Sequence, residues 1–218
     1  MPTETPAPPD LEILPGQIEG PLRFETLFGR IAPVEAEIGI GKGRFILAEA
    51  SLRRDVDFLG LEWSLKHLRI ARDRASKLGL ANVRFHRADA RHVFADLIAD
   101  AALQRVHVYC PDPWPKKRHH KRRLFNAEMA RHLERVLAPG GHLNVSTDVK
   151  EYFDAIVETV DAATGLRRAV DPIYPADAAT GLTNYETKYL AAGRVIHRAT
   201  WRREPGGGIR NAGSPNGA

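Results

Sequence analysis

The 218-residue sequence contains one cysteine, Cys110, and few long apolar stretches. A single cysteine excludes an intrachain disulfide framework and is typical of proteins from reducing compartments. Apolar residues make up 43% of the chain, but no run approaches the length that crosses a bilayer. Residues 1–4 have neither the basic nor the apolar region of a secretory signal. We therefore expect a cytoplasmic protein that does not contact membranes.

Excess positive charge is almost absent outside one segment. Lys and Arg number 32 and Asp and Glu number 27, which gives a net charge of +5. Residues 116–135 contain eight Lys or Arg and two Glu, so this segment carries +6 and the rest of the chain sums to −1. A basic block on a nearly neutral body favours a polyanionic partner. The alternative is a solvated charged surface.

The length predicts one sizeable domain with tails. Residues 1–33 contain seven of the fifteen prolines, which disfavour helices and central strands, so we predict a flexible N-terminal arm there. Residues 34–204 form the predicted domain. Residues 205–218 are rich in Gly, Pro, Asn and Ser and predict a disordered tail.

Strand and helix patterns alternate through the predicted domain. Apolar β runs lie at residues 34–40, 56–62, 83–87, 105–110 and 143–147. Helical patterns lie at residues 43–52, 64–78, 91–103, 124–137 and 150–162. Residues 194–203 alternate apolar and polar side chains without a following helix. This order predicts an α/β fold with a mainly parallel sheet and an antiparallel pair at its edge.

Open α/β sheets bind ligands beyond the carboxyl ends of their strands, so residues there are candidate site residues. The first predicted strand leads through Glu37 into a turn with Gly39, Gly41 and Gly43. Glycines let the backbone turn sharply and approach a ligand closely. The spacing is G-x-G-x-G, which differs from the dinucleotide G-x-G-x-x-G motif. A purely structural turn is the alternative.

Acidic residues follow the next two strands. Glu62 ends the second strand, and Asp89 with Ala90 follows the third. A carboxylate at the second position can accept both ribose hydroxyls of an adenosine cofactor. A carboxylate at the third can accept from an adenine amino group. Either acid alone fits a solvated loop, but three acids after three successive strands favour a positively charged ligand over a pyrophosphate.

The fourth strand leads into a rigid acidic and aromatic turn. Asp112 stands between Pro111 and Pro113, and Trp114 offers a face for stacking. A basic segment, residues 116–123, follows directly; it consists of Lys116, Lys117, Arg118, His119, His120, Lys121, Arg122 and Arg123. Such charge is suited to phosphate contacts. A solvated loop is the alternative, and a metal site at the two histidines is disfavoured because no paired ligand spacing accompanies them.

Two later stretches also fall on the expected ligand side. Asp148 follows the fifth strand, and Thr183, Asn184, Tyr185 and Glu186 follow a loop rich in Pro, Asp and Ala. Glu186 can accept N1–H and N2–H from guanine, and Tyr185 can stack or donate. A capping turn before the edge strands is an equally weighted alternative for residues 183–186.

Together these motifs resemble the bacterial single-subunit tRNA (guanine-N7-)-methyltransferase family over about residues 28–203. The resemblance implies a Rossmann-like S-adenosylmethionine-dependent methyltransferase fold, a seven-stranded, mostly parallel sheet whose last strand is antiparallel. It implies methylation of a guanine in the variable loop of tRNA to 7-methylguanosine. It places Glu37, Glu62, Asp89 and Asp112 at the cofactor, beside Ala90 and the three glycines of the turn. Asp112 would be catalytic. Substrate residues would be Lys116, Asp148 and Thr183 to Glu186, and residues 118–123 would contact RNA.

Four rival functions share part of this pattern. An NAD-dependent dehydrogenase leaves the basic segment unexplained, and a non-catalytic RNA-binding module leaves Glu37, Glu62 and Asp89 without a role. A covalent cytosine methyltransferase needs a nucleophilic cysteine, whereas Cys110 fits a small buried apolar residue. An N6-adenine or amide methyltransferase would not need an acid at position 112. We expect no metal and no obligate protein partner, and the oligomeric state stays open.

Overall fold

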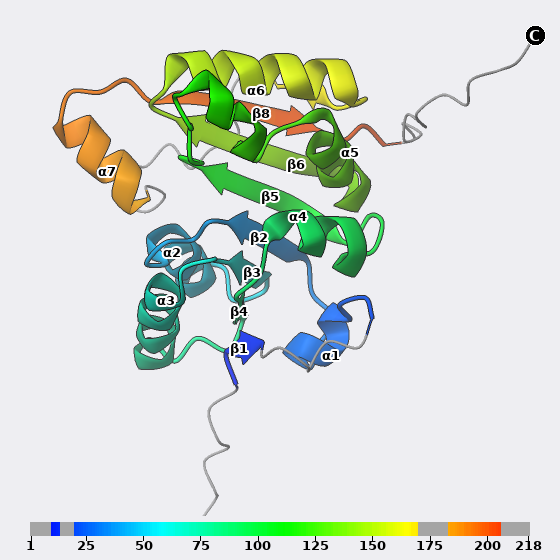
Figure 1. Cartoon of the computed structure of the whole chain (residues 1–218). Helices are drawn as coiled ribbons and strands as arrows, with labels where there is room; N and C mark the ends of the chain where they lie inside the picture. Colours follow the sequence, from blue (N-terminus) through cyan, green and yellow to red (C-terminus); the bar gives the residue numbers. More distant parts are fainter. Residues whose placement is uncertain (1–9, 14–19, 170–182, 206–218) are drawn as a thin grey trace, which may run out of the picture.

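The computed structural model describes residues 10–13, 20–169 and 183–205 (Figure 1). The described strands are β1 (Glu12–Ile13), β2 (Val34–Ile38), β3 (Asp57–Leu61), β4 (Val83–His86), β5 (Leu103–Tyr109), β6 (Leu137–Thr147), β7 (Arg167–Arg168) and β8 (His197–Arg202). The α-helices are α1 (Phe24–Phe28), α2 (Arg44–Leu52), α3 (Leu65–Lys77), α4 (Ala90–His92), α5 (Ala127–Val136), α6 (Lys150–Ala163) and α7 (Asn184–Ala191). A π-helical turn, η1 (Val93–Leu97), and a 3-10 helix, η2 (Lys117–Arg122), complete the described elements.

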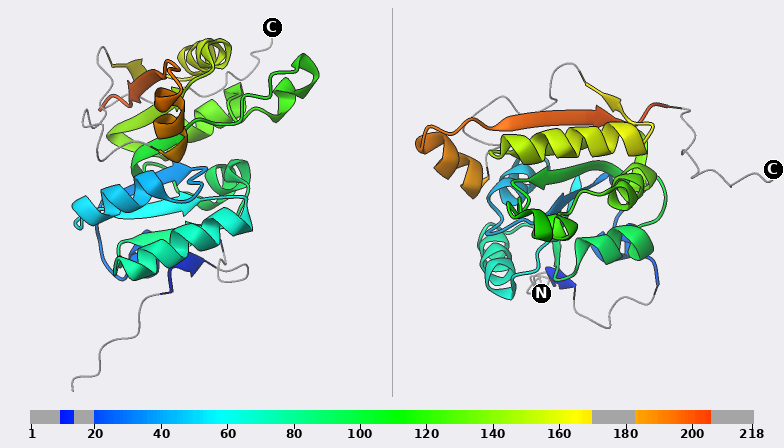
Figure 2. Two further views of the ribbon diagram at one scale, coloured as in Figure 1. Left: turned by 90° about the vertical axis from the view of Figure 1, so that its left-hand side faces the viewer. Right: turned by 45° about the horizontal axis from the view of Figure 1, so that its top comes forward.

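The described strands form one sheet in the order β1-β4-β3-β2-β5-β6-β8-β7. Pairing is parallel from β1 through β6, whereas β8 runs antiparallel to both β6 and β7. Strands β1 and β7 lie at opposite edges of the sheet (Figures 1 and 2). The mostly parallel α/β fold with an antiparallel last strand is therefore confirmed, with eight strands in place of seven.

Two apolar clusters lie on opposite faces of the sheet. On one face, Phe58 and Phe85 pack with side chains of α2 and α3. On the other, Leu59 and Leu61 belong to a larger cluster with η1, α5 and α6. Successive residues of a strand point to opposite faces, which is why Phe58 and Leu59 fall into different clusters. The sheet is thus covered by helices on both sides, as parallel sheets require.

Helix boundaries follow the capping signals of the sequence. Ser64 caps α3 by accepting from the backbone N–H of His67 at 3.4 Å, and Asn126 caps α5 by accepting from that of Met129 at 2.8 Å. Gly79 follows α3 with a φ of 60°, the left-handed conformation of a helix C-terminus. The predicted helices at residues 64–78 and 150–162 are confirmed to within one residue at each end.

Part of the predicted N-terminal arm packs on the domain. Strand β1 pairs with β4, and Ile13 is buried in the larger apolar cluster. The Leu22 N–H donates to the Leu97 carbonyl at 2.7 Å, and α1 follows. The prolines do not exclude a helix in this part of the arm, because Pro21 and Pro33 flank α1 rather than lie within it. The remaining arm, residues 1–9 and 14–19, and the predicted tail at 206–218 lie outside the described residues.

Two further elements differ from their prediction. The helix expected at residues 91–103 ends at Leu97, because Ile98 takes extended backbone angles, φ −100° and ψ 124°, and β5 begins at Leu103. Strand β6 begins at Leu137, so Pro139 and Gly140 lie within the strand instead of before it. Among the described residues, no helix is long and apolar enough to cross a membrane.

Candidate functional site

The carboxyl ends of the parallel strands lie together at one end of the sheet, on the left of Figure 1 near α7. A pocket of about 220 Å³ lies at this end. Strand β2 has β3 on one side and β5 on the other, so the chain order reverses beside it and a crevice opens at this switch point. The lining residues are Glu37, Gly39, Ile40, Gly41, Lys42, Arg44, His67, Tyr109, Thr183 and Lys188.

The glycine turn is shaped for close approach. Gly39, Gly41 and Gly43 all have positive φ, at 77°, 53° and 77°. A Cβ on Gly43 would lie 2.8 Å from the Ala71 Cβ, so this glycine also lets α2 pack tightly on α3. The backbone itself therefore forms one wall of the pocket, and two of the predicted glycines line it directly.

Among the described residues that line the pocket, Glu37 is the one carboxylate. Its side chain is 3% exposed, and its Oε2 has no hydrogen-bond partner among the described residues. Burial raises the pKa of Glu37 to about 8; a backbone hydrogen bond from Ile46 opposes this rise, and the charges of Glu186, Glu62 and Glu49 add to it. A buried carboxyl oxygen without a partner is costly unless a ligand supplies one, so the Oε2 of Glu37 is poised to receive a cationic or hydrogen-bond-donating group.

A buried polar chain beneath the pocket ends at Tyr109. Buried Glu35 accepts from Arg53 at 2.7 and 2.6 Å, which with His107 holds the pKa of Glu35 well below its usual range despite burial. The His107 Nε2 lies 3.1 Å from the second Glu35 oxygen, and its Nδ1 lies 2.7 Å from the Tyr109 hydroxyl. Phe45 packs on both rings, with centroid separations of 4.8 Å. This network fixes the Tyr109 ring in the pocket wall.

Glu62 and Asp89 stand at the predicted strand ends but outside the lining of this pocket. Glu62 accepts from the Gly41 N–H at 2.8 Å and from the Ser64 N–H at 2.7 Å. It thereby joins the glycine turn to the start of α3. Asp89 is exposed and caps α4 by accepting from the Arg91 N–H at 2.9 Å, and Ala90 is the first helical residue behind it. Both carboxylates accept from backbone N–H groups, and neither residue is buried.

The turn after β5 is strained at both ends. Cys110 and Trp114 have positive φ, at 49° and 43°, which bulky L-residues rarely adopt. Between them Asp112 is exposed and makes no hydrogen bond or ion pair with any other described residue. Burial, together with the charges of Glu186 and Asp148, raises the pKa of the Cys110 thiol to about 12. A thiol of this kind is a poor nucleophile, whereas the Asp112 carboxylate is free to act.

The basic segment forms η2 and presents its side chains unevenly. Arg122 lies over the Trp114 ring at 4.9 Å from its centroid, and His119 meets the same ring edge-on at 5.9 Å. The Trp114 face predicted for stacking is therefore already covered by Arg122. Of the residues predicted to contact RNA, Arg118, Lys121 and Arg122 are exposed, whereas His119 and His120 are half-buried; Lys116, predicted to bind substrate, and Lys117 are exposed as well.

Arg123 differs from its predicted role. Its side chain is 7% exposed, and its Nε donates to the Pro113 carbonyl at 2.8 Å. Its two terminal nitrogens donate to Glu151 at 3.1 and 2.8 Å, and the guanidinium lies 4.6 Å from the Tyr152 ring centroid. All of its donor edges face the protein, so this geometry supports a clamp that ties the 111–115 turn to α6 and gives no support to RNA contact by Arg123.

Three of the predicted substrate residues, Asp148, Thr183 and Glu186, are engaged within the protein. Asp148 is nearly buried and pairs with Arg194 at 2.5 Å. Thr183 caps α7, and Glu186 completes a capping box by accepting from the Thr183 N–H at 2.9 Å. Glu186 is 0% exposed and also accepts from Ser146 at 2.9 Å and Arg198 at 3.1 Å. The capping alternative is thus confirmed; the side chains of Asn184 and Tyr185 lie outside the described part of the structure.

Several pocket residues were given no site role in the sequence analysis. Lys42 and Arg44 lie within and just after the glycine turn, His67 lies in the first turn of α3, and Lys188 lies one turn along α7. Only their proximity to a recognised motif could have drawn attention to them. No group of three or more His, Cys, Asp or Glu side chains is arranged around a common point in the described residues.

Comparison with known proteins gives consistent matches. A family model described as "Putative methyltransferase" matches residues 31–199. The tRNA (guanine-N(7)-)-methyltransferase of Chromohalobacter salexigens is 36% identical over 71% of this chain, and the match spans 63% of that relative's length. The protein of the same name from Syntrophotalea carbinolica is 34% identical, and the match covers 86% of this chain and 82% of that one. The structure is similar to the crystal structure of the 16S rRNA methyltransferase KamB, with a TM-score of 0.61 at 17% identity. The match covers 84% of this chain and 93% of that one.

Proposed function

Because the chain belongs to the tRNA (guanine-N7-)-methyltransferase family, we propose that it methylates N7 of a guanine in the variable loop of tRNA, with S-adenosylmethionine as donor. The products are 7-methylguanosine and S-adenosylhomocysteine. One observation carries the proposal. Exposed Asp112, without a partner among the described residues, stands in a strained turn between the end of the pocket-lining strand β5 and the cationic helix η2.

The pocket and the neighbouring strand ends suit a cationic adenosine cofactor. The unpartnered Oε2 of Glu37 and the open backbone of the glycine turn match a positively charged amino-acid moiety. Glu62 would hold the ribose hydroxyls, and Asp89 beside Ala90 would accept from the adenine amino group. Three carboxylates at successive strand ends disfavour a pyrophosphate-containing cofactor.

The chemistry asks little of the protein beyond alignment and charge. S-adenosylmethionine supplies an electrophilic methyl group on a sulfonium sulfur. The N7 lone pair of guanine forms the new bond to carbon, and the carbon–sulfur electron pair leaves with sulfur. No proton has to be removed from N7, so no strong general base is needed. Positive charge moves onto the purine, and the Asp112 carboxylate would stabilise it there.

The exposed cations of the basic segment would hold the RNA. Lys116 stands directly after the turn, and Arg118, Lys121 and Arg122 project from η2. Phosphate contacts by such side chains give affinity that falls steeply with salt. Their position beside Asp112 would direct a loop nucleotide toward the carboxylate.

The test is methyl transfer from labelled S-adenosylmethionine to unmodified tRNA, followed by nucleoside analysis. We expect the label in 7-methylguanosine. Asp112→Asn should lower kcat by about 100-fold, the effect of removing one electrostatic stabiliser, with little change in cofactor affinity. Asp55→Asn is the matched control, because Asp55 is an exposed acid just before β3, at the amino ends of the strands and away from the pocket.

Three results would count against the proposal. Label in another nucleoside would retain the methyltransferase and overturn the choice of base. Equal losses of rate and cofactor affinity in Asp112→Asn would remove the catalytic role from Asp112. Neither transfer nor cofactor binding by the wild-type protein would favour an RNA-binding module.

A further inference from the structure

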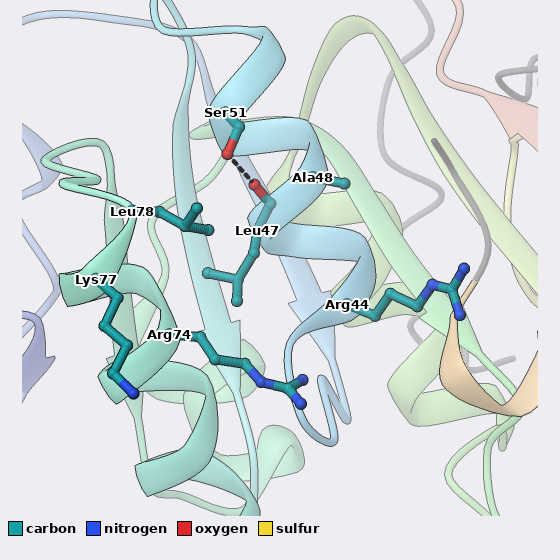
Figure 3. A pocket seen from close by; sticks show the side chains of 7 residues that line it. All are labelled: Arg44, Leu47, Ala48, Ser51, Arg74, Lys77 and Leu78. Atoms are coloured by element: carbon teal, nitrogen blue, oxygen red, sulfur yellow. Dashed lines mark hydrogen bonds between the residues drawn. The ribbon is translucent and has the colours of Figure 1, made fainter. Parts of the chain in front are cut away.

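A second, larger hollow of about 480 Å³ lies between α2 and α3 (Figure 3). Its floor is apolar and consists of Leu47, Ala48 and Leu78. Its rim carries three cations, Arg44, Arg74 and Lys77, all of them exposed. With Ser51, these residues line the hollow, which we call the α2–α3 groove.

No acid in the described part of the chain forms an ion pair with this rim. None of the residues that line the groove is acidic. The neighbouring acids are engaged elsewhere, since Asp73 pairs with Arg72 at 2.8 Å and Glu49 pairs with Arg53 at 2.6 Å. Among the described residues, Arg44 and Lys77 have no ion pair. The groove therefore presents unbalanced positive charge to the solvent.

The charge continues into the cofactor pocket. Arg44 lines both hollows, and Figure 3 shows its guanidinium directed away from Leu47 and Leu78. Arg74 lies between Lys77 and Arg44 in the same view and donates to the Lys42 carbonyl of the glycine turn at 3.0 Å. Lys42 and Lys188 then line the pocket itself. These cations therefore extend from the end of α3 to the pocket.

We propose that the α2–α3 groove binds the sugar-phosphate backbone of the substrate RNA, an inference that rests on the proposed function. A row of single, separated cations matches successive phosphates, and the apolar floor is suited to ribose and base faces. An acidic protein would match the charge, but the row leads into the pocket where the RNA has to deliver its base.

This surface is distinct from the basic segment. Helices α2 and α3 pack on one face of the sheet, whereas the basic segment is tied through Arg123 to Glu151 of α6 on the other face. The cofactor pocket lies between them at the strand ends. RNA bound to both surfaces would straddle the pocket, and its position would be set from two sides.

The experiment compares tRNA binding by Lys77→Ala, Lys77→Glu and wild-type protein over a range of salt concentrations. Lys77 lines the groove but not the cofactor pocket, so cofactor affinity should not change. Losing one phosphate contact should reduce the slope of log K against log salt by about 0.7 to 0.9 and weaken binding about five- to eightfold at 0.1 M salt. Lys77→Glu should weaken it further.

Arg131→Ala and Arg131→Glu are the matched controls, because Arg131 is an exposed cation on α5, across the sheet. These variants should bind tRNA like the wild type. Normal slopes for both Lys77 variants, with methylation intact, would overturn the groove proposal and leave the groove to a protein partner. A wild-type protein that neither binds nor methylates tRNA would instead refute the proposed function, and this inference with it.

Discussion

Arg122 and Arg123 are adjacent, identical in chemistry and predicted alike, yet the structure assigns them opposite consequences. Replacing Arg123 with Ala removes a donor to the Pro113 carbonyl, a two-pronged contact with Glu151 and a guanidinium above the Tyr152 ring. Replacing Arg122 with Ala removes an exposed side chain that covers Trp114. We expect Arg123→Ala to lower the stability of the protein and Arg122→Ala to weaken RNA binding.

The size of the effect follows from the contacts. A hydrogen bond from a charged donor such as that to the part-buried Pro113 carbonyl contributes about 1.5–3 kcal/mol, and the cation–π contact adds about 1 kcal/mol. Glu151 is exposed, so its ion pair adds less than about 1 kcal/mol. Because these contributions overlap, we expect Arg123→Ala to lower the free energy of unfolding by about 3 kcal/mol. For a protein of this length, that corresponds to a fall in Tm of about 6–12 °C.

Thermal and denaturant unfolding measure this directly. Arg122→Ala should stay within about 1 kcal/mol of the wild type, while its salt dependence of tRNA binding flattens by about 0.8. Arg123→Lys keeps the charge without the planar fork and should recover only part of the stability. Equal stability of Arg122→Ala and Arg123→Ala, or a flattened salt dependence for folded Arg123→Ala, would refute the assignment of the clamp.

Two further predictions concern the cofactor pocket. The pKa of Glu37 rises from 4.5 to about 8 on folding, so between these pH values the unfolded state ionises while the folded state keeps its proton, and the buried acid destabilises the protein increasingly. Glu37→Gln should therefore gain stability relative to wild type as pH rises from 5 to 8, and a pH-independent difference in Tm would contradict the shift. Gly43→Ala should cost about 1–2 kcal/mol from its left-handed φ alone, with more from the close Ala71 contact, and should weaken S-adenosylmethionine binding; calorimetry that finds normal affinity would show that the turn tolerates the methyl group.

The repeating elements of this fold could be predicted because each carries its own local signal. The helix after Ser64 has a cap, an amphipathic pattern and a terminal glycine, and it forms where expected. The acids at the strand ends could be predicted because parallel topology fixes where carboxyl ends meet. The resemblance to the family is confirmed by the comparisons.

What could not be predicted depends on direction and on distant partners. Strand β1 is two residues long and exists because β4 offers an open edge. Residues 122 and 123 differ in environment because η2 ends between them and the chain turns Arg123 inward, which a charge count cannot show. The Thr183 to Glu186 spacing matches a capping box, but only the fold brings Ser146 and Arg198 to the same carboxylate.

The buried state of Glu186 has a consequence for how a base could be selected. Its oxygens accept from Thr183, Ser146 and Arg198, so a guanine that uses Glu186 must take the place of donors already present. Recognition would then be an exchange in which the α7 cap opens as the base enters. A purine without the N2 amino group would offer one donor fewer and would leave the cap closed more often. The preference for guanosine would then appear in turnover. Guanosine-containing tRNA should turn over faster than inosine-containing tRNA, with little difference in affinity.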